Sequence, residues 1–104
     1  MKTLPGPQDP EFIENLLKTG AVRVERIVST GHVSPPGYWY DQEEDEWVLL
    51  LQGRARLEYE DGGGDALERG DWVFIPAHRR HRVAYTSETP FCLWLAIFVD
   101  SAAS

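Results

Sequence analysis

The chain has 104 residues, which is enough for one domain with a single hydrophobic core. Its 17 acidic side chains outnumber its 10 lysines and arginines, and the formal net charge is -7. Proteins that bind nucleic acids or anionic membranes need a surplus of positive charge, so this composition argues against both kinds of partner. The expected partner is a small molecule, a metal ion or another protein.

Cys92 is the only cysteine, so the chain cannot form an intramolecular disulfide, which fits a reducing cytoplasm. The first ten residues lack the apolar core of a signal peptide. The longest apolar run, residues 91–99, is too short to cross a bilayer as a helix. These features predict a cytoplasmic protein that does not enter membranes.

Residues 1–20 are predicted to form an N-terminal arm followed by a short helix. Asp9 is a suitable helix N-cap, and Pro10 suits the first helical position. An apolar stripe at helical spacing follows, and Gly20 supplies a stop signal. The stripe consists of Phe12, Ile13, Leu16 and Leu17.

From residue 21 to residue 100 the pattern is typical of β-strands that form one domain. Residues 54–60 alternate between apolar and charged side chains, which predicts a strand with one face in the core and the other in water. The three glycines in residues 61–65 predict a hairpin. Residues 72–75 form a short apolar run that ends at Pro76. Residues 91–99 are continuously apolar, which indicates a strand covered on both faces, inside the barrel wall or at a subunit interface.

Several short strands separated by glycine and proline turns predict an all-β barrel or sandwich. Two stretches refine this prediction, because the spacing of their glycine, glutamate, proline and histidine residues forms two motifs. The first motif consists of Gly37, Glu46 and Gly53. The second consists of Gly70, Pro76 and His81, and it begins after 16 intervening residues.

In these two motifs the chain resembles the cupin superfamily, and in particular its small single-domain bacterial members. The resemblance covers about half of the chain and implies a jelly-roll β-barrel. It also implies where a metal site should lie, because cupins usually bind a metal through three histidines and a glutamate.

Transferring the family pattern places Tyr40 and Gln42 at two histidine positions, Glu46 at the carboxylate and His81 at the last histidine. A protonated tyrosine and a glutamine carbonyl are weak ligands for transition metals. His78 lies three residues before His81 and is a further candidate ligand, although in the charged turn it also fits a surface histidine. The resemblance implies zinc, iron, manganese or nickel at these residues, or an altered pocket without a metal.

The arginines around His81 suggest an anion as a second kind of occupant. Arg80 and Arg82 flank His81, and a guanidinium aimed into the barrel binds a carboxylate or phosphate through two hydrogen bonds. Tyr85 stands where the second motif commonly ends in asparagine, and we include it among the candidate ligand-binding residues. The alternative is that these arginines belong to a solvated turn and pair with the acidic residues 41–46.

Three functions follow from these observations. The first is a small cupin that binds a metal ion, a small anionic molecule or both in the barrel. The second is a cupin enzyme, such as a metal-dependent dioxygenase, decarboxylase or isomerase, or a metal-free isomerase in which His81 acts as the base and Tyr40 as the acid. The third is a structural or regulatory dimer with no chemistry. Residues 91–99 and the resemblance predict a homodimer.

Overall fold

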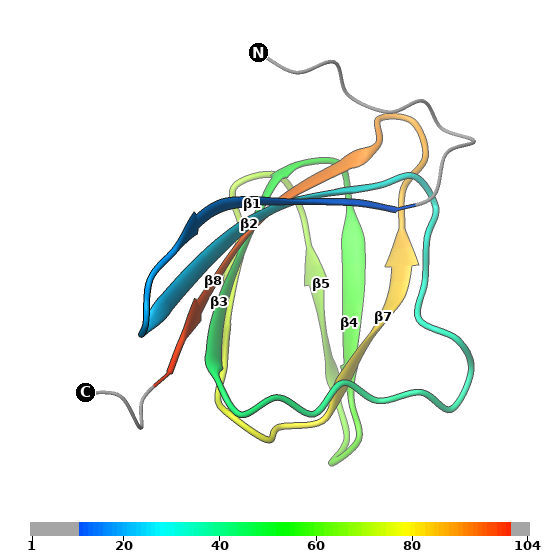
Figure 1. The fold of residues 1–104 in the computed structure, drawn as a ribbon. Helices are drawn as coiled ribbons and strands as arrows, with labels where there is room; N and C mark the ends of the chain where they lie inside the picture. The colour runs from blue at the N-terminus through cyan, green and yellow to red at the C-terminus, as the bar shows by residue number, and fades with distance from the viewer. Residues whose placement is uncertain (1–10, 101–104) are drawn as a thin grey trace.

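The computed structural model describes residues 11–100, and within them all regular secondary structure is β-strand. Figure 1 shows the strands wrapped into a barrel. They are β1 (Phe12–Lys18), β2 (Val22–Ser29), β3 (Asp45–Gln52), β4 (Ala55–Tyr59), β5 (Gly64–Leu67), β6 (Trp72–Ile75), β7 (His81–Thr86) and β8 (Cys92–Val99).

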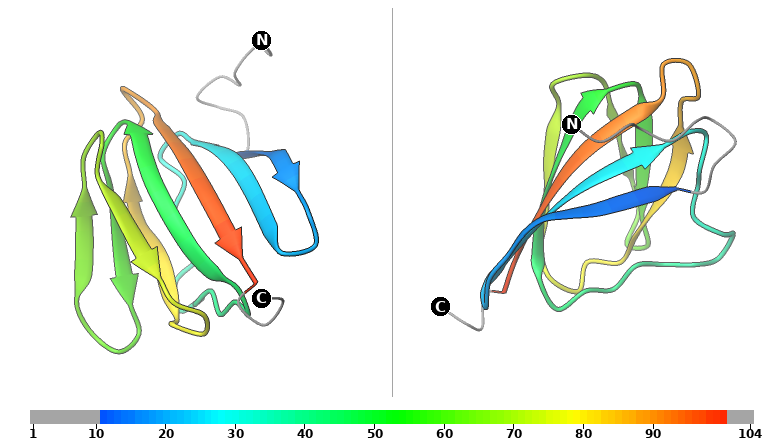
Figure 2. Two further views of the ribbon diagram at one scale, coloured as in Figure 1. Left: turned by 90° about the vertical axis from the view of Figure 1, so that its left-hand side faces the viewer. Right: turned by 45° about the horizontal axis from the view of Figure 1, so that its top comes forward.

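Two antiparallel sheets face each other. One has five strands in the order β1-β2-β8-β3-β6, and the other has three in the order β5-β4-β7. The left-hand view of Figure 2 looks onto the five-stranded sheet. The neighbours within each sheet are mostly distant in sequence, which is the arrangement of a jelly roll. The predicted all-β jelly-roll fold is therefore confirmed.

Strand β8 is the central strand of the larger sheet and pairs with β2 on one side and β3 on the other. Its inward side chains are buried, and they are Cys92, Trp94, Ala96 and Phe98. Its outward side chains are half-buried. The side chains of β2 and β3 flank the outward side chains of β8 on both sides, so the outward face of residues 91–99 is partly covered and the inward face fully covered.

The smaller sheet follows the predicted alternation. Ala55, Leu57 and Tyr59 on β4 are each at least 95% buried, while Arg54 before the strand and Arg56 within it are exposed. The predicted hairpin joins β4 to β5. Strand β6 covers the predicted run 72–75, and Leu50 of β3 is fully buried at the centre of the core that the two sheets enclose.

The predicted N-terminal helix is wrong, because residues 12–18 form the edge strand β1, which pairs with β2. A β-bulge between Asn15 and Leu17 inserts one extra residue, so the spacing of the apolar side chains imitates a helical stripe. Two contacts attach this segment to β2: Arg26 donates a hydrogen bond to Glu14, and Ser29 donates one to Glu11. Pairing with β2 overrides the local helical propensity.

The predicted arm and the helix-start signals at Asp9 and Pro10 lie outside the described residues. The division of the chain at residue 20 stays a prediction, although β1 makes residues 12–18 part of the larger sheet. In the described part of the chain, no helix is long and apolar enough to cross a membrane.

Gly53 and Gly70, one from each motif, both have positive φ angles, of 89° and 92°. At Gly53 an added Cβ would lie 2.8 Å from the carbonyl oxygen of Phe91 and 2.8 Å from the Ser87 hydroxyl oxygen. At Gly70 an added Cβ would meet no atom within 4 Å.

We therefore expect Gly53→Ala to be much more harmful than Gly70→Ala. The backbone conformation alone should cost Gly70→Ala about 1–2 kcal/mol in the free energy of unfolding. Gly53→Ala should lose about 3 kcal/mol or more, because the clash adds to the same backbone cost. Urea unfolding of both variants measures the difference, and equal losses would contradict the crowding at Gly53.

Candidate functional site

A cavity of about 320 Å³ lies between the two sheets and is the candidate site. Apolar side chains from both sheets form most of its wall, and a smaller set of polar residues lines the rest. The polar or charged residues are Glu11, Arg23, Glu25, Tyr40, Gln42, Glu46 and His81. A mainly apolar pocket with a few polar groups is the usual form of a small-molecule site.

The strand register places Arg23, Phe98 and Glu46 in one row across the larger sheet. Arg23 of β2 pairs with Phe98 of β8, and Phe98 pairs in turn with Glu46 of β3. Paired residues in antiparallel strands share a face, so all three side chains point into the barrel. The Arg23 guanidinium lies 4.0 Å from the centre of the Phe98 ring.

Arg23 forms ion pairs with Glu25 and with Glu44, the latter at 2.7 Å. Glu25 is one of the buried charged residues of the protein and lies on the same strand as Arg23. The two ion pairs fix the guanidinium at the edge of the cavity and place its charge between two carboxylates.

Glu46 and His81 face each other from opposite sheets and are both more than 90% buried. His81 is the first residue of β7 and pairs with Tyr59 of β4. Its Nε2 lies 3.6 Å from Oε1 of Glu46, and this oxygen is buried without a hydrogen-bond partner in the structure. The distance exceeds a hydrogen bond, so the two groups face each other across a small gap.

The protonation of the pair follows from the second ring nitrogen of His81. Nδ1 lies 2.9 Å from the carbonyl oxygen of Arg79, and a carbonyl only accepts, so Nδ1 carries a proton. In the neutral ring Nε2 is then an acceptor. An ionised Glu46 opposite it is also an acceptor, so the pair needs a proton or another positively charged group between its two members.

Burial sets the proton affinities of both groups. It raises the pKa of Glu46 to about 7, and the nearby Glu25 charge adds to this rise. Burial also lowers the pKa of the His81 ring below its ordinary value. Near neutral pH the carboxyl group therefore exchanges a proton readily, while the ring stays neutral.

Tyr40 and Gln42 reach the cavity from the segment before β3. Tyr40 pairs with the backbone of His81: its N–H donates to the His81 carbonyl at 2.7 Å, and the His81 N–H donates back at 3.2 Å. The His78 N–H donates to the Gln42 carbonyl at 2.7 Å. The rings of Tyr40 and His81 stack with 5.7 Å between their centres. Burial raises the pKa of the Tyr40 hydroxyl, so it stays protonated.

The side chain of His78 is not among those that line the cavity. It is 65% exposed, and Nδ1 lies 2.8 Å from the Asp41 carboxylate. Asp41 lies between Tyr40 and Gln42, and its side chain points to solvent because neighbouring residues in extended chain face opposite ways. The structure brings His78 and Asp41 together outside the barrel.

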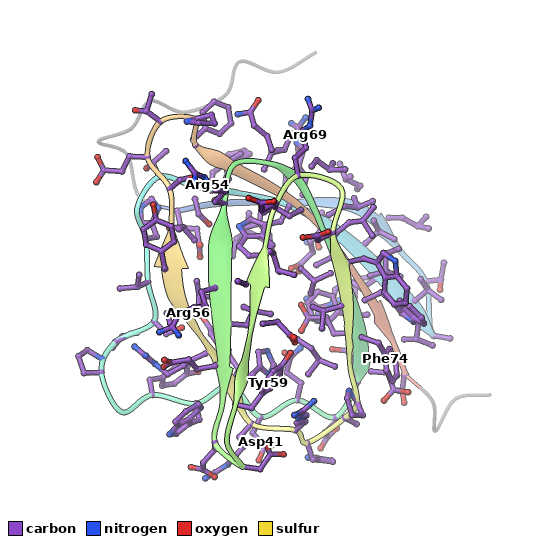
Figure 3. All side chains as sticks on the ribbon, turned by 180° about the vertical axis from the view of Figure 1, so that it is seen from behind. Asp41, Arg54, Arg56, Tyr59, Arg69 and Phe74 are labelled. Atoms are coloured by element: carbon purple, nitrogen blue, oxygen red, sulfur yellow. The ribbon has the colours of Figure 1, made fainter. Side chains whose placement is uncertain are left out.

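Arg80, Arg82 and Tyr85 also lie outside the cavity lining. Arg80 is exposed and pairs with Asp41 and Glu60. Figure 3 shows Asp41 at the β4–β5 hairpin end of the barrel, opposite the end where Arg54 and Arg69 lie. Arg82 pairs with Glu58 at 2.9 Å and donates to the Ser34 carbonyl. Tyr85 is about half exposed on β7.

The donor set does not fit a tightly bound transition metal. Within residues 11–100 no group of three or more histidine, cysteine, aspartate or glutamate side chains is arranged to hold a metal ion. Glu46 and His81 supply two ligands of this type, and Tyr40 and Gln42 are the neutral groups beside them. Two strong ligands hold a divalent ion only weakly.

Sequence reasoning did not predict Glu11, Arg23 and Glu25 as part of the site. On β2 the charged side chains Arg23 and Glu25 point inward, while Val22 and Val24 point outward. An alternating strand is normally read with its charged face in water, so the pattern alone suggests the opposite orientation. A strand with a charged face shortly before the first motif in the sequence is the signal that could have drawn attention to these residues.

The facing sheets, the cavity between them and the buried carboxylate–histidine pair define a jelly-roll barrel protein with an internal cavity. The cupin domain family model matches residues 25–98 of the chain. The chain therefore belongs to the cupin family, as its two motifs predicted.

Solved structures give the same result. A proposed mannose-6-phosphate isomerase from Ralstonia eutropha JMP134 is 40% identical, with a TM-score of 0.89 over 94% of this chain and 92% of that one. A cupin superfamily protein from Desulfitobacterium hafniense DCB-2 is 18% identical, with a TM-score of 0.78 over 92% and 83%. KdgF from Halomonas sp. is 23% identical, with a TM-score of 0.71 over 85% and 76%. The last two share the fold alone. No curated protein matches the sequence.

The raised pKa of Glu46 predicts a specific dependence of stability on pH. The folded state keeps a proton that the unfolded chain releases above its ordinary pKa of 4.5. This stabilising contribution is complete below about pH 4.5 and is lost as the pH rises through about 7. We expect the free energy of unfolding of Glu46→Gln, relative to wild type, to rise by roughly 2–3 kcal/mol between pH 5 and pH 8.

Urea unfolding followed by circular dichroism at several pH values measures this difference. Glu60→Gln is the matched control, because it removes the same charge from the exposed hairpin instead of the cavity. His81 contributes to the pH dependence of both the wild type and Glu46→Gln. A constant difference between Glu46→Gln and wild type would contradict the raised pKa.

Proposed function

We propose that this cupin binds a small molecule in the barrel cavity and that Glu46 and His81 contact it directly. The observation that carries the proposal is the buried Oε1 of Glu46, which has no hydrogen-bond partner and faces Nε2 of His81 across 3.6 Å. An unpartnered buried oxygen is costly, and a bound molecule that donates a hydrogen bond to it removes that cost.

A cavity-filling substitution tests this function. Val83 is half-buried and lines the cavity, so Val83→Phe should occupy part of the space without adding a charge. A ligand found in a thermal-shift screen of small polar molecules should raise the unfolding midpoint of the wild type and have little effect on Val83→Phe. A ligand that shifts both proteins equally binds elsewhere and would argue against the cavity as the site.

A metal-free isomerase is the second candidate. Such an enzyme needs one group that accepts a proton and another that donates one, and Nε2 of His81 and the protonated hydroxyl of Tyr40 are suited to these roles. Glu46 can take up the proton that His81 acquires, because its pKa lies near neutrality. The proposed isomerase activity of the Ralstonia eutropha protein supports this candidate.

The anionic ligand expected from the sequence stays a prediction, and the geometry gives it little support. Arg80 and Arg82, which were expected to hold the anion, lie outside the cavity lining and pair with carboxylates. Arg23 is the arginine that lines the cavity, and it is committed to Glu25 and Glu44.

A divalent metal ion at Glu46 and His81 also stays a prediction, and their facing lone pairs favour it. Because the donor set is incomplete, we expect added zinc or manganese to bind reversibly and to be removed completely by dialysis against a chelator. His81→Ala should abolish this binding, while His78→Ala should leave it unchanged because the His78 side chain lies outside the cavity. Plasma mass spectrometry measures the metal content before and after dialysis. One ion per chain remaining after chelation would contradict the expected weak binding.

The exposed face of the larger sheet supports the predicted homodimer. Trp47 of β3 packs against Trp72 and Phe74 of β6 with ring centres 5.0 and 4.9 Å apart, and all three are exposed by more than a third. Pairing continues these rows onto half-buried outward side chains of β8, from Trp47 to Ile97 and from Leu49 to Leu95. A continuous apolar face of this kind is typical of a subunit interface.

Analytical ultracentrifugation tests the homodimer. We expect the wild type to sediment as a dimer and Trp47→Glu to sediment as a monomer, because a charge would be buried at the centre of the interface. Tyr85→Glu is the control, since Tyr85 has comparable exposure on the other sheet. A monomeric wild type would rule out this interface.

The cytoplasmic location remains a proposal that rests on the cysteine content. Cys92 is buried on β8 and carries a free thiol, which is compatible with a reducing compartment.

A further inference from the structure

The cavity presents an excess of hydrogen-bond acceptors. Three glutamates, Glu11, Glu25 and Glu46, line it together with the Nε2 acceptor of His81. A second observation also points to a ligand. Oε1 of Glu46 has no hydrogen-bond partner in the structure, although its side chain is 90% buried. Buried acceptors of this kind are normally satisfied, so the site lacks a donor.

The donors nearest to these acceptors are already engaged. Arg23 donates to Glu25 and Glu44, and its guanidinium is held against Phe98. The Trp94 Nε1–H donates to Ser29, and the Ser29 hydroxyl donates to Glu11. None of these groups, nor the Tyr40 hydroxyl or the Gln42 amide that also line the cavity, donates a hydrogen bond to Oε1 of Glu46, so an occupant with an N–H donor can satisfy this oxygen.

The charge of the lining also favours a positive occupant. Three carboxylates stand against the single guanidinium of Arg23, and Arg23 also pairs with Glu44 outside this set. The net charge of these lining groups stays negative even when Glu46 is protonated. In a partly enclosed cavity, where the dielectric constant is lower than in bulk water, such a charge repels anions and attracts cations more strongly than it would in water.

The remaining wall is apolar and determines the rest of the ligand. Leu57 and Val83 from the smaller sheet face Val48 and Trp94 from the larger one across the cavity. A bare inorganic ion would leave this surface without contacts, whereas a hydrocarbon body would cover it.

We propose that the occupant is a small organic cation, a protonated amine carried on an apolar body, whose N–H groups donate to Glu46 and to Nε2 of His81. The inference rests on the proposed function, since it names the class of molecule that the same cavity binds. The ammonium group supplies both the missing donors and the missing positive charge, and the apolar body covers the aliphatic and aromatic wall.

Three probes with the same ring and different charge test the proposal. Benzylamine, benzyl alcohol and benzoate are titrated at pH 8 into the full chain in the presence of a chelator, and binding is followed by isothermal calorimetry and by NMR shifts of residues lining the cavity. We expect benzylamine to bind at least about tenfold more tightly than benzyl alcohol, because a hydrogen bond to a charged group is worth more than one to a neutral group. Benzoate should bind most weakly.

Glu46→Gln should weaken benzylamine binding at least about tenfold and change benzyl alcohol binding less than threefold. Glu60→Gln removes the same charge from the exposed hairpin and should change neither. If Glu46→Gln does not fold, Glu11→Gln gives a second test at a residue on the rim of the larger sheet, with a smaller weakening expected. Zinc and manganese are titrated alone, without chelator, as a separate arm.

The outcomes separate this inference from the proposed function. If benzyl alcohol or benzoate binds in the cavity at least as tightly as benzylamine, the proposal of a cationic ligand is wrong, while the proposal of a small-molecule site still holds. Tighter binding of zinc or manganese than of benzylamine, lost in Glu46→Gln, would overturn it in favour of a metal. If no probe perturbs the residues lining the cavity, both the inference and the proposed function fail.

Discussion

Pairing of β8 with both β2 and β3 is the constraint on which the site depends. The pairing with β2 covers all of β8 and the pairing with β3 covers residues 93–99, so the inward face of β8 determines the inward faces of its two neighbours around Glu46. Through Phe98 it aligns Arg23 and Glu46 in one row, although they are distant in sequence. The opposite sheet then brings His81 to Glu46. The same strand register therefore sets both the core and the cavity. If β3 slipped by one residue against β8, the Glu46 side chain would point out of the barrel.

The site is best understood from its unsatisfied carboxyl group. The family resemblance implies histidines and a metal beside the glutamate, but here Tyr40 and Gln42 stand at two of those histidine positions. The cavity keeps the carboxylate, adds Glu25 and Glu11 beside it, and commits Arg23 elsewhere. The raised pKa of Glu46 and the acceptor-rich lining are consequences of the same arrangement, because buried negative charge favours either a proton or a cation.

Local patterns predicted much of the fold because they report local physics. Alternation on β4 located a half-buried strand, the glycine-rich turn located its hairpin, and Pro76 marked the end of β6. The N-terminal segment was predicted as a helix because the bulge after Asn15 gives its apolar residues helical spacing. A bulge is formed by pairing with another strand, so residues 12–18 alone carry no sign of it.

The sequence by itself determined the barrel fold and the inward positions of Glu46 and His81, since glycine and proline spacing sets the turns and alternation sets the faces. Only the tertiary structure decided what surrounds that pair. Whether Arg23 and Glu25 face the cavity or the solvent depends on the strand beside them. His78 and Arg80 lie outside the site, where they pair with Asp41 and Glu60. Such choices depend on contacts between distant segments, and no short stretch of sequence contains both partners.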